Sequence, residues 1–183
     1  MANVLFISEQ KLKAVTALHE NVEPQDILPM VQQAQDIYVQ SLMGTTWYNG
    51  LKSRIVASTI TSDEETFLDD YVATMLANYA LYMAIPTLAY KIFNKSVMQP
   101  TSEESTPATL EQIKYVSDSV HNTAEFYRQR ALEYLKQNQT LFPEYINPDS
   151  NDGMVPDKYM DYYGGLVIPK PFGCGYYGEE NQD

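Results

Sequence analysis

The 183-residue sequence is poor in the residue types that many enzymes and metalloproteins depend on. It has one cysteine, Cys174, and two histidines, His19 and His121. A single cysteine excludes an internal disulfide and fits a reducing compartment. No histidine stands near Cys174 in the sequence, and its neighbours are glycines, which suggest a turn. We therefore expect no catalytic cysteine.

Basic residues are also scarce. The chain has 12 lysines and arginines against 24 aspartates and glutamates, which gives a formal net charge of −12. Neutralising nucleic-acid phosphates requires clustered lysine and arginine, and no segment of this chain is net basic. A surface that grips DNA or RNA is therefore not expected. Acidity of this kind serves solubility, and it also suits a surface that must not stick to DNA.

Long apolar runs and a leader pattern are missing as well. No stretch of 18 consecutive apolar residues occurs, so we expect no transmembrane helix. Residues 1–8 lack a basic region, and Glu9 comes too early for a signal peptide, which predicts that the protein stays where it is made. The hydrophobic share of 44% is near the globular average, so a core is expected.

The hydrophobic pattern predicts an all-α fold. We expect a helical bundle of about four helices, two of them long, over residues 25–146. Extended arms are expected on both sides, an N-terminal arm over residues 1–24 and a C-terminal arm over residues 147–183. Within the first arm, residues 8–11 could form one helical turn. Residues 12–19 then alternate weakly between apolar and polar, which favours an extended conformation.

The first two helices are indicated by their capping residues and their spacing. Asp26 is expected to cap the first helix, with Pro29 in its first turn and Gly44 just past its end. Gln35 falls on the face expected to point outward. A short helix then follows, with one apolar side formed by Trp47, Tyr48, Leu51 and Ile55.

Two long helices make up the rest of the predicted bundle. Ser62 and Glu65 have the spacing of a capping box, which predicts a helix from Ser62 to about Val97. Residues 77–89 are almost all apolar, so burial on most sides is expected there, with a kink at Pro86.

The second long helix is expected to begin at Thr106 and Pro107 and to end near Asn138. Glu125 and Arg128 are expected to pair on its outer face. Its packing side shows the alternating three- and four-residue spacing of a coiled-coil seam, formed by Leu110, Ile113, Ser117, Val120, Ala124, Tyr127, Ala131 and Tyr134.

Candidate metal sites are weak. Asp118 and His121 have helical spacing that suits a metal pair, but a helical carboxylate site needs a second such pair and more inward glutamates. Residues 149–153 only partly resemble a calcium loop, because the glycine is one position early and no glutamate follows at the twelfth position. We interpret both as ordinary surface features and expect no metal, no cofactor and no catalytic residue.

The C-terminal arm is the most unusual stretch. It contains six of the eight glycines and four of the ten prolines, which excludes long helices or strands. It is nevertheless rich in aromatic residues, which are favoured anchors of protein interfaces. An arm that packs on its own domain is one interpretation, and an arm that lies on a neighbouring subunit is the one that we favour. The expected interface residues are Tyr159, Tyr162, Tyr163, Phe172, Tyr176 and Tyr177.

The order of motifs along the chain resembles the head-to-tail connector (adaptor) proteins of tailed bacteriophages, most of all those of crAss-like phages. The resemblance covers about residues 5–146, and no single motif in it is diagnostic. The C-terminal arm lies outside it. The segments that carry the resemblance are, in order, Ala34–Tyr38, Leu42–Thr45, Tyr79–Tyr82 with Pro86, Tyr90–Lys95, Asn122–Tyr127 and Leu141–Tyr145.

The resemblance implies a non-enzymatic structural virion protein. Such connectors are small helical proteins that assemble into a homo-oligomeric ring, commonly a dodecamer, beneath the portal protein. The ring extends the DNA channel and offers a docking surface to neck and tail proteins, and DNA passes through it without specific binding. The implied location is the head–tail junction of the virion, after assembly in the host cytoplasm, with no membrane involved.

Two other functions are compatible with the residues alone. A soluble intracellular adaptor between proteins would need the same helical core and no active site. A helical-bundle enzyme would need a metal or carboxylate centre, for which Asp118 and His121 are the candidates.

Overall fold

The computed structural model describes residues 4–93, 96–98, 108–149 and 153–157. These residues form a helical bundle, which confirms the all-α fold class. One small antiparallel hairpin follows α6, made of β1 (Lys91–Phe93) and β2 (Ser96–Met98). The helices are α1 (Glu9–Val15), α2 (Pro24–Ala34), η1 (Gln35–Val39), α3 (Gln40–Met43), α4 (Thr45–Ala57), α5 (Ser62–Phe67), η2 (Leu68–Val72), α6 (Ala73–Ala89), α7 (Leu110–Gln137), η3 (Gln139–Leu141) and α8 (Pro143–Ile146).

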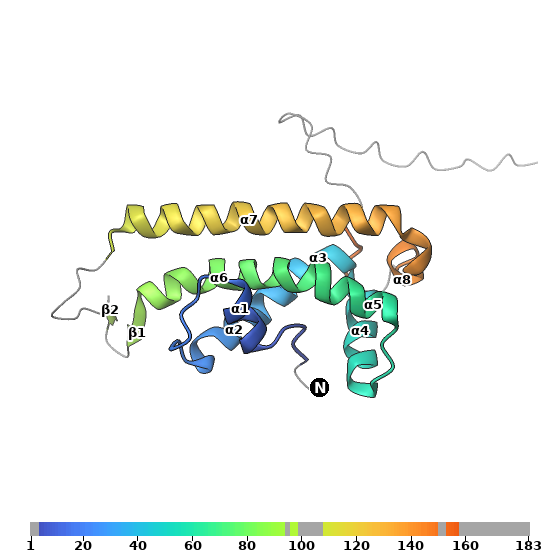
Figure 1. Ribbon diagram of the computed structural model, residues 1–183, viewed down its shortest axis with the longest axis horizontal. Helices are drawn as coiled ribbons and strands as arrows, with labels where there is room; N and C mark the ends of the chain where they lie inside the picture. Colours follow the sequence, from blue (N-terminus) through green and yellow to red (C-terminus); the bar gives the residue numbers. More distant parts are fainter. Residues whose placement is uncertain (1–3, 94–95, 99–107, 150–152, 158–183) are drawn as a thin grey trace, which may run out of the picture.

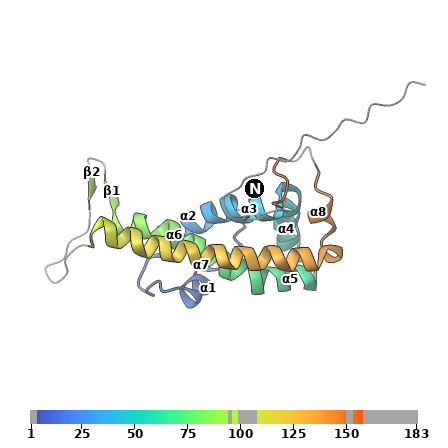
Figure 2. The ribbon, with the colours of Figure 1, turned by 90° about the horizontal axis from the view of Figure 1, so that it is seen from above.

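Helix α6 lies at the centre of the bundle. It contacts α7 on one side and α2 on another (Figure 1). The elements α5, η2 and α6 follow one another without a break, and α7 runs antiparallel beside them (Figures 1 and 2). Helix α4 stands across one end of the bundle, where α8 also packs. The arrangement matches the four main helices that the sequence predicts, two of them long.

The core near α4 is aromatic. The ring centroids of Trp47 and Phe67 lie 5.4 Å apart, and those of Trp47 and Phe142 lie 4.9 Å apart. All three side chains are buried. Further along α6, the ring of Tyr79 stacks on Tyr38 with the centroids 3.7 Å apart. Aromatic pairs at the separations of Trp47 with Phe67 and with Phe142 contribute about 0.5–1.5 kcal/mol each beyond the area that they bury.

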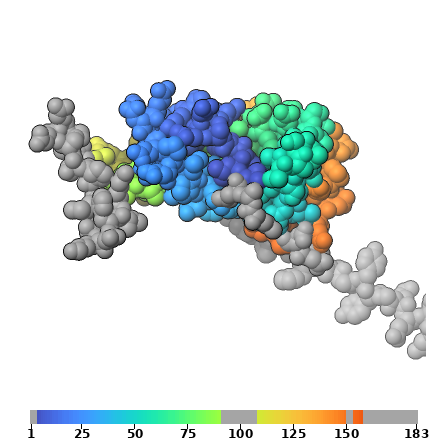
Figure 3. Space-filling model, turned by 90° about the horizontal axis from the view of Figure 1, so that it is seen from below, coloured from blue at the N-terminus to red at the C-terminus, as the bar shows by residue number. Residues whose placement is uncertain are grey.

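The extended conformation expected for residues 12–19 is wrong for residues 12–15, which belong to helix α1, whereas Thr16 is extended. Ser8 caps α1 by accepting a hydrogen bond from Lys11 N at 3.2 Å. Leu12 is 1% exposed and Ile7 is 5% exposed, and both belong to the core. Burying these two side chains outweighs the weak local alternation. The N-terminal segment consequently lies against α2 and next to α4 (Figure 3).

Gln35, which was expected to face outward, is fully buried. Its side chain accepts a hydrogen bond from Phe6 N at 2.8 Å and donates one to Val4 O at 2.9 Å. Gln35 also donates to the hydroxyl of Tyr48 at 3.1 Å. An amide has both a donor and an acceptor, so it can satisfy the backbone of a segment that has no strand or helix partner. The π-helical turn η1 begins at this residue.

The first main helix begins earlier than the expected Asp26. Glu23 is its N-cap residue and Pro24 occupies the first helical position, where the missing N–H of proline costs nothing. Pro29 therefore lies inside α2 rather than in its first turn. The other end agrees with the prediction, because Gly44 follows α3 with a positive φ of 79°.

The capping box of α5 lies one residue earlier than expected. Thr61 is the N-cap residue, and its partner is Glu64. The continuous helix also ends at Ala89 rather than near Val97, and Pro86 lies in its last turn. The apolar stretch 77–89 is only partly buried, because several of its side chains are half-exposed.

Helix α7 begins at Leu110, behind a capping box made by Thr109 and Gln112. The expected start at residues 106–107 lies outside the described residues. The end is as predicted, with Asn138 as the C-cap residue. The predicted seam is buried only towards the end of the helix: Ala124 is fully buried, whereas Leu110 is 69% exposed.

The continuous helical run Ser62–Ala89 is long and apolar enough, by length and composition, to cross a membrane. It was not expected from the sequence, because its apolar residues do not form an unbroken run. Half of the residues in its most apolar 18-residue stretch are buried inside the bundle. Helices α2 and α7 supply that cover. This packing is typical of the central helix of a helical domain.

Candidate interaction site at the anchor of the C-terminal segment

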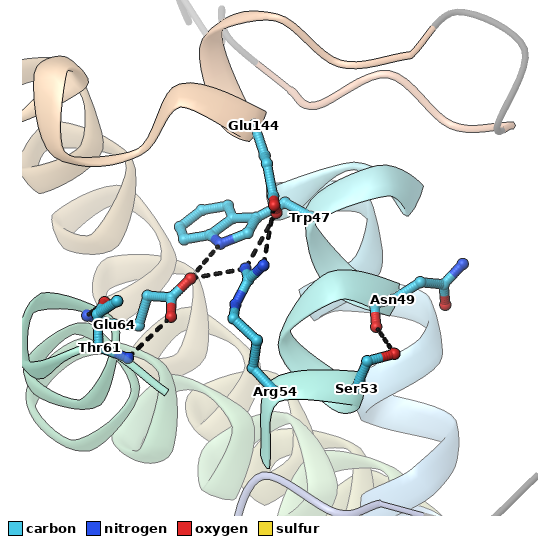
Figure 4. Close-up of polar contacts among 7 residues, drawn as sticks. All are labelled: Trp47, Asn49, Ser53, Arg54, Thr61, Glu64 and Glu144. Atoms are coloured by element: carbon cyan, nitrogen blue, oxygen red, sulfur yellow. Dashed lines mark hydrogen bonds and ion pairs between the residues drawn. The ribbon is translucent and has the colours of Figure 1, made fainter. Parts of the chain in front are cut away.

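A group of charged residues joins three helices at one end of the bundle (Figure 4). Arg54 on α4 donates two hydrogen bonds to Glu144 on α8, from Nη1 to Oε1 at 2.8 Å and from Nη2 to Oε2 at 3.0 Å. Arg54 Nη2 also lies 2.6 Å from Glu64 Oε1 on α5. The hydrogen bonds to Glu144, followed by the charge of Glu64, raise the pKa of Arg54 against the opposing effect of burial. The guanidinium therefore links α4, α5 and α8.

Glu64 has two further roles in this group. Its Oε2 accepts a hydrogen bond from Thr61 N at 3.1 Å and so completes the capping box of α5. Its Oε1 accepts a longer hydrogen bond from the indole nitrogen of Trp47 at 3.4 Å. A carboxylate that is 7% exposed is stable only when charge and hydrogen bonds compensate for its burial. Arg54, Thr61 and Trp47 supply that compensation.

Gly50 makes room for the pair between Arg54 and Glu144. A Cβ at this position would lie 2.9 Å from Glu144 Oε2 and 3.1 Å from Arg54 Nη1. A side chain there would push the carboxylate away from the guanidinium. The absence of a side chain at this turn of α4 thus lets α8 approach closely.

A cavity of about 250 Å³ lies beside this group. Its apolar wall consists of Trp47, Leu141, Phe142 and Pro143. Its polar wall consists of Arg54, Thr61, Glu64 and Glu144. Most pockets for whole small ligands measure about 300–1,000 Å³. This one is smaller, and a single bulky side chain is a better match to it.

The chain that follows α8 returns to the start of α4. Asp149 N donates to Thr46 Oγ1 at 3.1 Å. Thr45 N donates to Met154 O at 2.9 Å, and Met154 N donates to Thr45 Oγ1 at 2.9 Å. We refer to residues 147–149 and 153–157 as the C-terminal anchor. Reciprocal bonds of this kind fix a segment that has no regular secondary structure.

The last residues of the anchor are also held. Pro156 is buried against Gly44, where an added Cβ would lie 2.6 Å from Pro156 Cδ. Asp157 N donates to Ser41 O at 3.1 Å. Asp157 Oδ2 lies 2.7 Å from Nη2 of Arg128, a side chain of α7 that is 8% exposed. The expectation that Arg128 lies on the outer face of α7 is therefore wrong, although Glu125 is still near it, at 4.0 Å.

These contacts show that the anchor packs on its own domain. The residues expected to form the interface, Tyr159, Tyr162, Tyr163, Phe172, Tyr176 and Tyr177, lie outside the described residues. We refer to residues 158–183 as the distal arm.

His121, the metal candidate of the sequence analysis, packs beside Glu125 and Tyr82. Nε2 of His121 lies 3.7 Å from Glu125 Oε1, and its ring packs against Tyr82 with the centroids 4.8 Å apart. Glu125 Oε1 accepts a hydrogen bond from the hydroxyl of Tyr79 at 2.7 Å. Within the described part of the chain, no three histidine, cysteine or acidic side chains are grouped so that they could hold a metal ion.

Sequence reasoning missed the central residues of this site. Arg54 and Glu144 are 90 positions apart, and no local pattern connects them. Asp157 and Arg128 are 29 positions apart and lie on different elements. The one usable signal was the capping box before α5, which was placed one residue late and so pointed to Glu65 instead of Glu64.

Comparison with known proteins gives one match. The model of a family of unknown function, DUF6712, matches residues 39–154. This range begins at the end of η1 and includes Arg54, Glu64 and Glu144. No curated protein and no solved structure matches the chain.

Proposed function

The chain belongs to the DUF6712 family of unknown function, and we propose that it is a structural virion protein that forms a ring in the neck of a tailed bacteriophage. In this proposal the ring joins the portal to the tail and extends the DNA channel. The protein is not an enzyme. Its partners are further copies of itself, the portal and the neck or tail proteins.

The C-terminal anchor is the observation that carries the proposal. It fixes the chain at Asp157 through Arg128 and Ser41, and the 26 residues of the distal arm begin there. An aromatic-rich segment that starts from a fixed point on a rigid domain is suited to hold a neighbouring subunit, because part of its ordering cost is already met. In a ring, each subunit meets the next through two different surface patches. In this proposal the distal arm supplies one of the two.

The resemblance to phage connectors supports the same function. Several of the segments that carry it belong to the bundle: Leu42–Thr45 surrounds the turn at Gly44, Asn122–Tyr127 lies in α7, and Leu141–Tyr145 leads into α8. The last of these segments supplies Phe142 and Glu144 to the site.

The charge of the chain is compatible with a DNA channel. With a net charge of −12, an acidic channel wall would repel phosphates and let DNA slide without being bound. A ring structure would contradict this part of the proposal if lysine and arginine lined the lumen and the acidic residues lay outside.

The first measurement is the mass of the purified protein over a range of concentrations, with electron microscopy of any large species. We expect a closed ring of roughly a dozen subunits around a central channel, either alone or after mixing with the portal of the same phage. A compact dimer at every concentration, with no affinity for the portal, would contradict the proposal. That result would favour the adaptor between soluble proteins instead.

A further inference from the structure

We propose that the cavity between α4, α5 and α8 receives a tyrosine side chain from the distal arm of a neighbouring copy of this chain. This inference rests on the proposed ring and names the surface that the arm of one subunit occupies on the next.

The size of the cavity suits one tyrosine. A volume of about 250 Å³ has room for one large side chain. Whole ligands usually occupy larger pockets. Interfaces are commonly stabilised by one or two aromatic anchors that fill pockets of this kind.

The two walls of the cavity suit the two ends of a tyrosine. Leu141 and Pro143 are exposed and offer apolar surface to the ring, whereas Trp47 and Phe142, which also line the cavity, are each only 1% exposed. Glu144 lies on the polar wall, and its side chain is 37% exposed, whereas that of Glu64 is 9% exposed. Glu144 is thus the carboxylate that a phenolic hydroxyl can reach as a donor, while Arg54 holds it in place.

The occupant is indicated by composition and length. The distal arm has five tyrosines, at positions 159, 162, 163, 176 and 177. Its 26 residues can extend over roughly 86 Å at about 3.3 Å per residue, which is enough to reach an adjacent subunit.

The course of the anchor favours a neighbouring copy over the same chain. After α8 the anchor contacts Thr46 through Asp149 and Thr45 through Met154, and then Ser41 through Asp157. Arg54 is nine residues beyond Thr45, about 13 Å along α4. The distal arm therefore begins beside α3 and α7 rather than at α8, and we assign its tyrosine to the cavity of the next subunit in the proposed ring.

Photo-crosslinking of the full-length protein tests this placement. Each tyrosine of the distal arm is replaced in turn, for example Tyr162→p-benzoylphenylalanine, and every variant is mixed with isotope-labelled wild-type protein before irradiation. We expect at least one position to cross-link to peptides containing Trp47 or residues 141–144, and to join labelled to unlabelled chains. Cross-links to these peptides within one chain only would overturn the exchange between copies, and cross-links elsewhere would overturn the pocket.

A matched pair of variants tests the same contact without the arm being altered. Leu141 is 43% exposed and lines the cavity, and Val56 is 64% exposed on α4 and does not line it. Leu141→Trp should raise the concentration needed for assembly at least tenfold, and Val56→Trp should leave it unchanged, with equal helical circular dichroism in both.

The outcomes separate the two proposals. Assembly of Leu141→Trp at the wild-type concentration would overturn the pocket and leave the ring intact. A wild-type chain that stays monomeric even with the portal would overturn the ring, and the docking of arms between copies with it.

Discussion

At the scale of single residues, Arg54 and Tyr79 show how buried polar groups determine which parts of the bundle are held together. Arg54 compensates for the burial of Glu64 while it binds Glu144, so three helices depend on one guanidinium. Tyr79 places a ring in the core and a hydroxyl against Glu125 on α7. Each of these residues joins elements that are distant in sequence.

Replacing Arg54 should destabilise the protein more than any surface substitution. Arg54→Met leaves the carboxylate of Glu64 buried without a cation, and we expect the free energy of unfolding to fall by about 3 kcal/mol. Arg54→Lys should lower the free energy of unfolding by less, because it keeps the positive charge. It should still lower it somewhat, because an ammonium group cannot bridge both carboxylates. Urea unfolding followed through the fluorescence of Trp47, the only tryptophan, measures both. A loss below about 0.5 kcal/mol for Arg54→Met would be typical of a surface change and would contradict the role given to it.

Stability should fall at alkaline pH. Burial, followed by the hydrogen bond to Glu125, raises the pKa of Tyr79 well above its ordinary value of 10. A group whose pKa is raised by folding stabilises the fold below its unfolded pKa and loses that contribution as the pH rises. Above pH 10, each such tyrosine should lower the free energy of unfolding by up to about 1.4 kcal/mol per pH unit.

Two variants identify the source of this alkaline loss. Tyr79→Phe should weaken the dependence of stability on pH above 10, and Tyr115→Phe, at a position that is 78% exposed, should not. Denaturant unfolding between pH 8 and 11 measures the difference. Equal slopes in the two variants would show that Tyr79 is not the group responsible.

At the scale of elements, the turn between α3 and α4 determines where the C-terminal anchor sits. Gly44 has φ 79° and ψ 158°, a conformation that is almost restricted to glycine. It also lies so close to Pro156 that no side chain fits. The same turn ends one helix, starts the next and receives the returning chain, so its geometry couples the bundle to the anchor.

Gly44→Ala should therefore loosen the anchor. Backbone strain of about 1–3 kcal/mol and the contact with Pro156 both oppose the new methyl group. We expect faster hydrogen exchange at Met154 N, together with a lower free energy of unfolding. Ser53→Ala, at an exposed position of α4, serves as the control and should change stability by less than about 0.5 kcal/mol. Unchanged protection at Met154 would show that the anchor does not depend on this turn.

At the scale of the whole molecule, the bundle and the distal arm have different roles in the proposed assembly. The bundle has its own aromatic core, and the anchor is fixed to the bundle through Pro156 at Gly44 and Asp157 at Arg128. The distal arm carries the aromatic residues that the sequence assigns to an interface. Removing the entire stretch from Asn147 would therefore remove the anchor as well, and a cut after Asp157 separates the two roles.

A chain that ends at Asp157 should fold like the full-length protein and fail to assemble. We expect the same helical circular dichroism and a melting temperature within a few degrees, because the removed residues make no part of the described core. Sedimentation with and without the portal measures assembly. A full-length variant with the six interface aromatics replaced by serine should behave in the same way, and normal assembly of either variant would contradict the role of the arm.

The sequence by itself determined the all-α class, the four main helices, the stop at Gly44 and the end of α7. Apolar spacing and capping residues are local signals, and they identify elements without knowledge of their partners. The same local signals also gave the errors in helix boundaries, because neighbouring residues offered near-equal alternatives. The elements shifted or missed were α1, the start of α2 and the capping box of α5.

Only the tertiary structure decided which polar residues are buried and where the returning chain packs. Gln35 and Arg128 have the spacing of surface residues, yet each is buried because a distant segment needs its hydrogen bonds or its charge. Arg54 meets Glu144 across 90 residues, and the cavity beside them exists because α8 returns to α4. Contacts of this kind depend on how the helices pack, and helical periodicity carries no information about the partner that a face will meet.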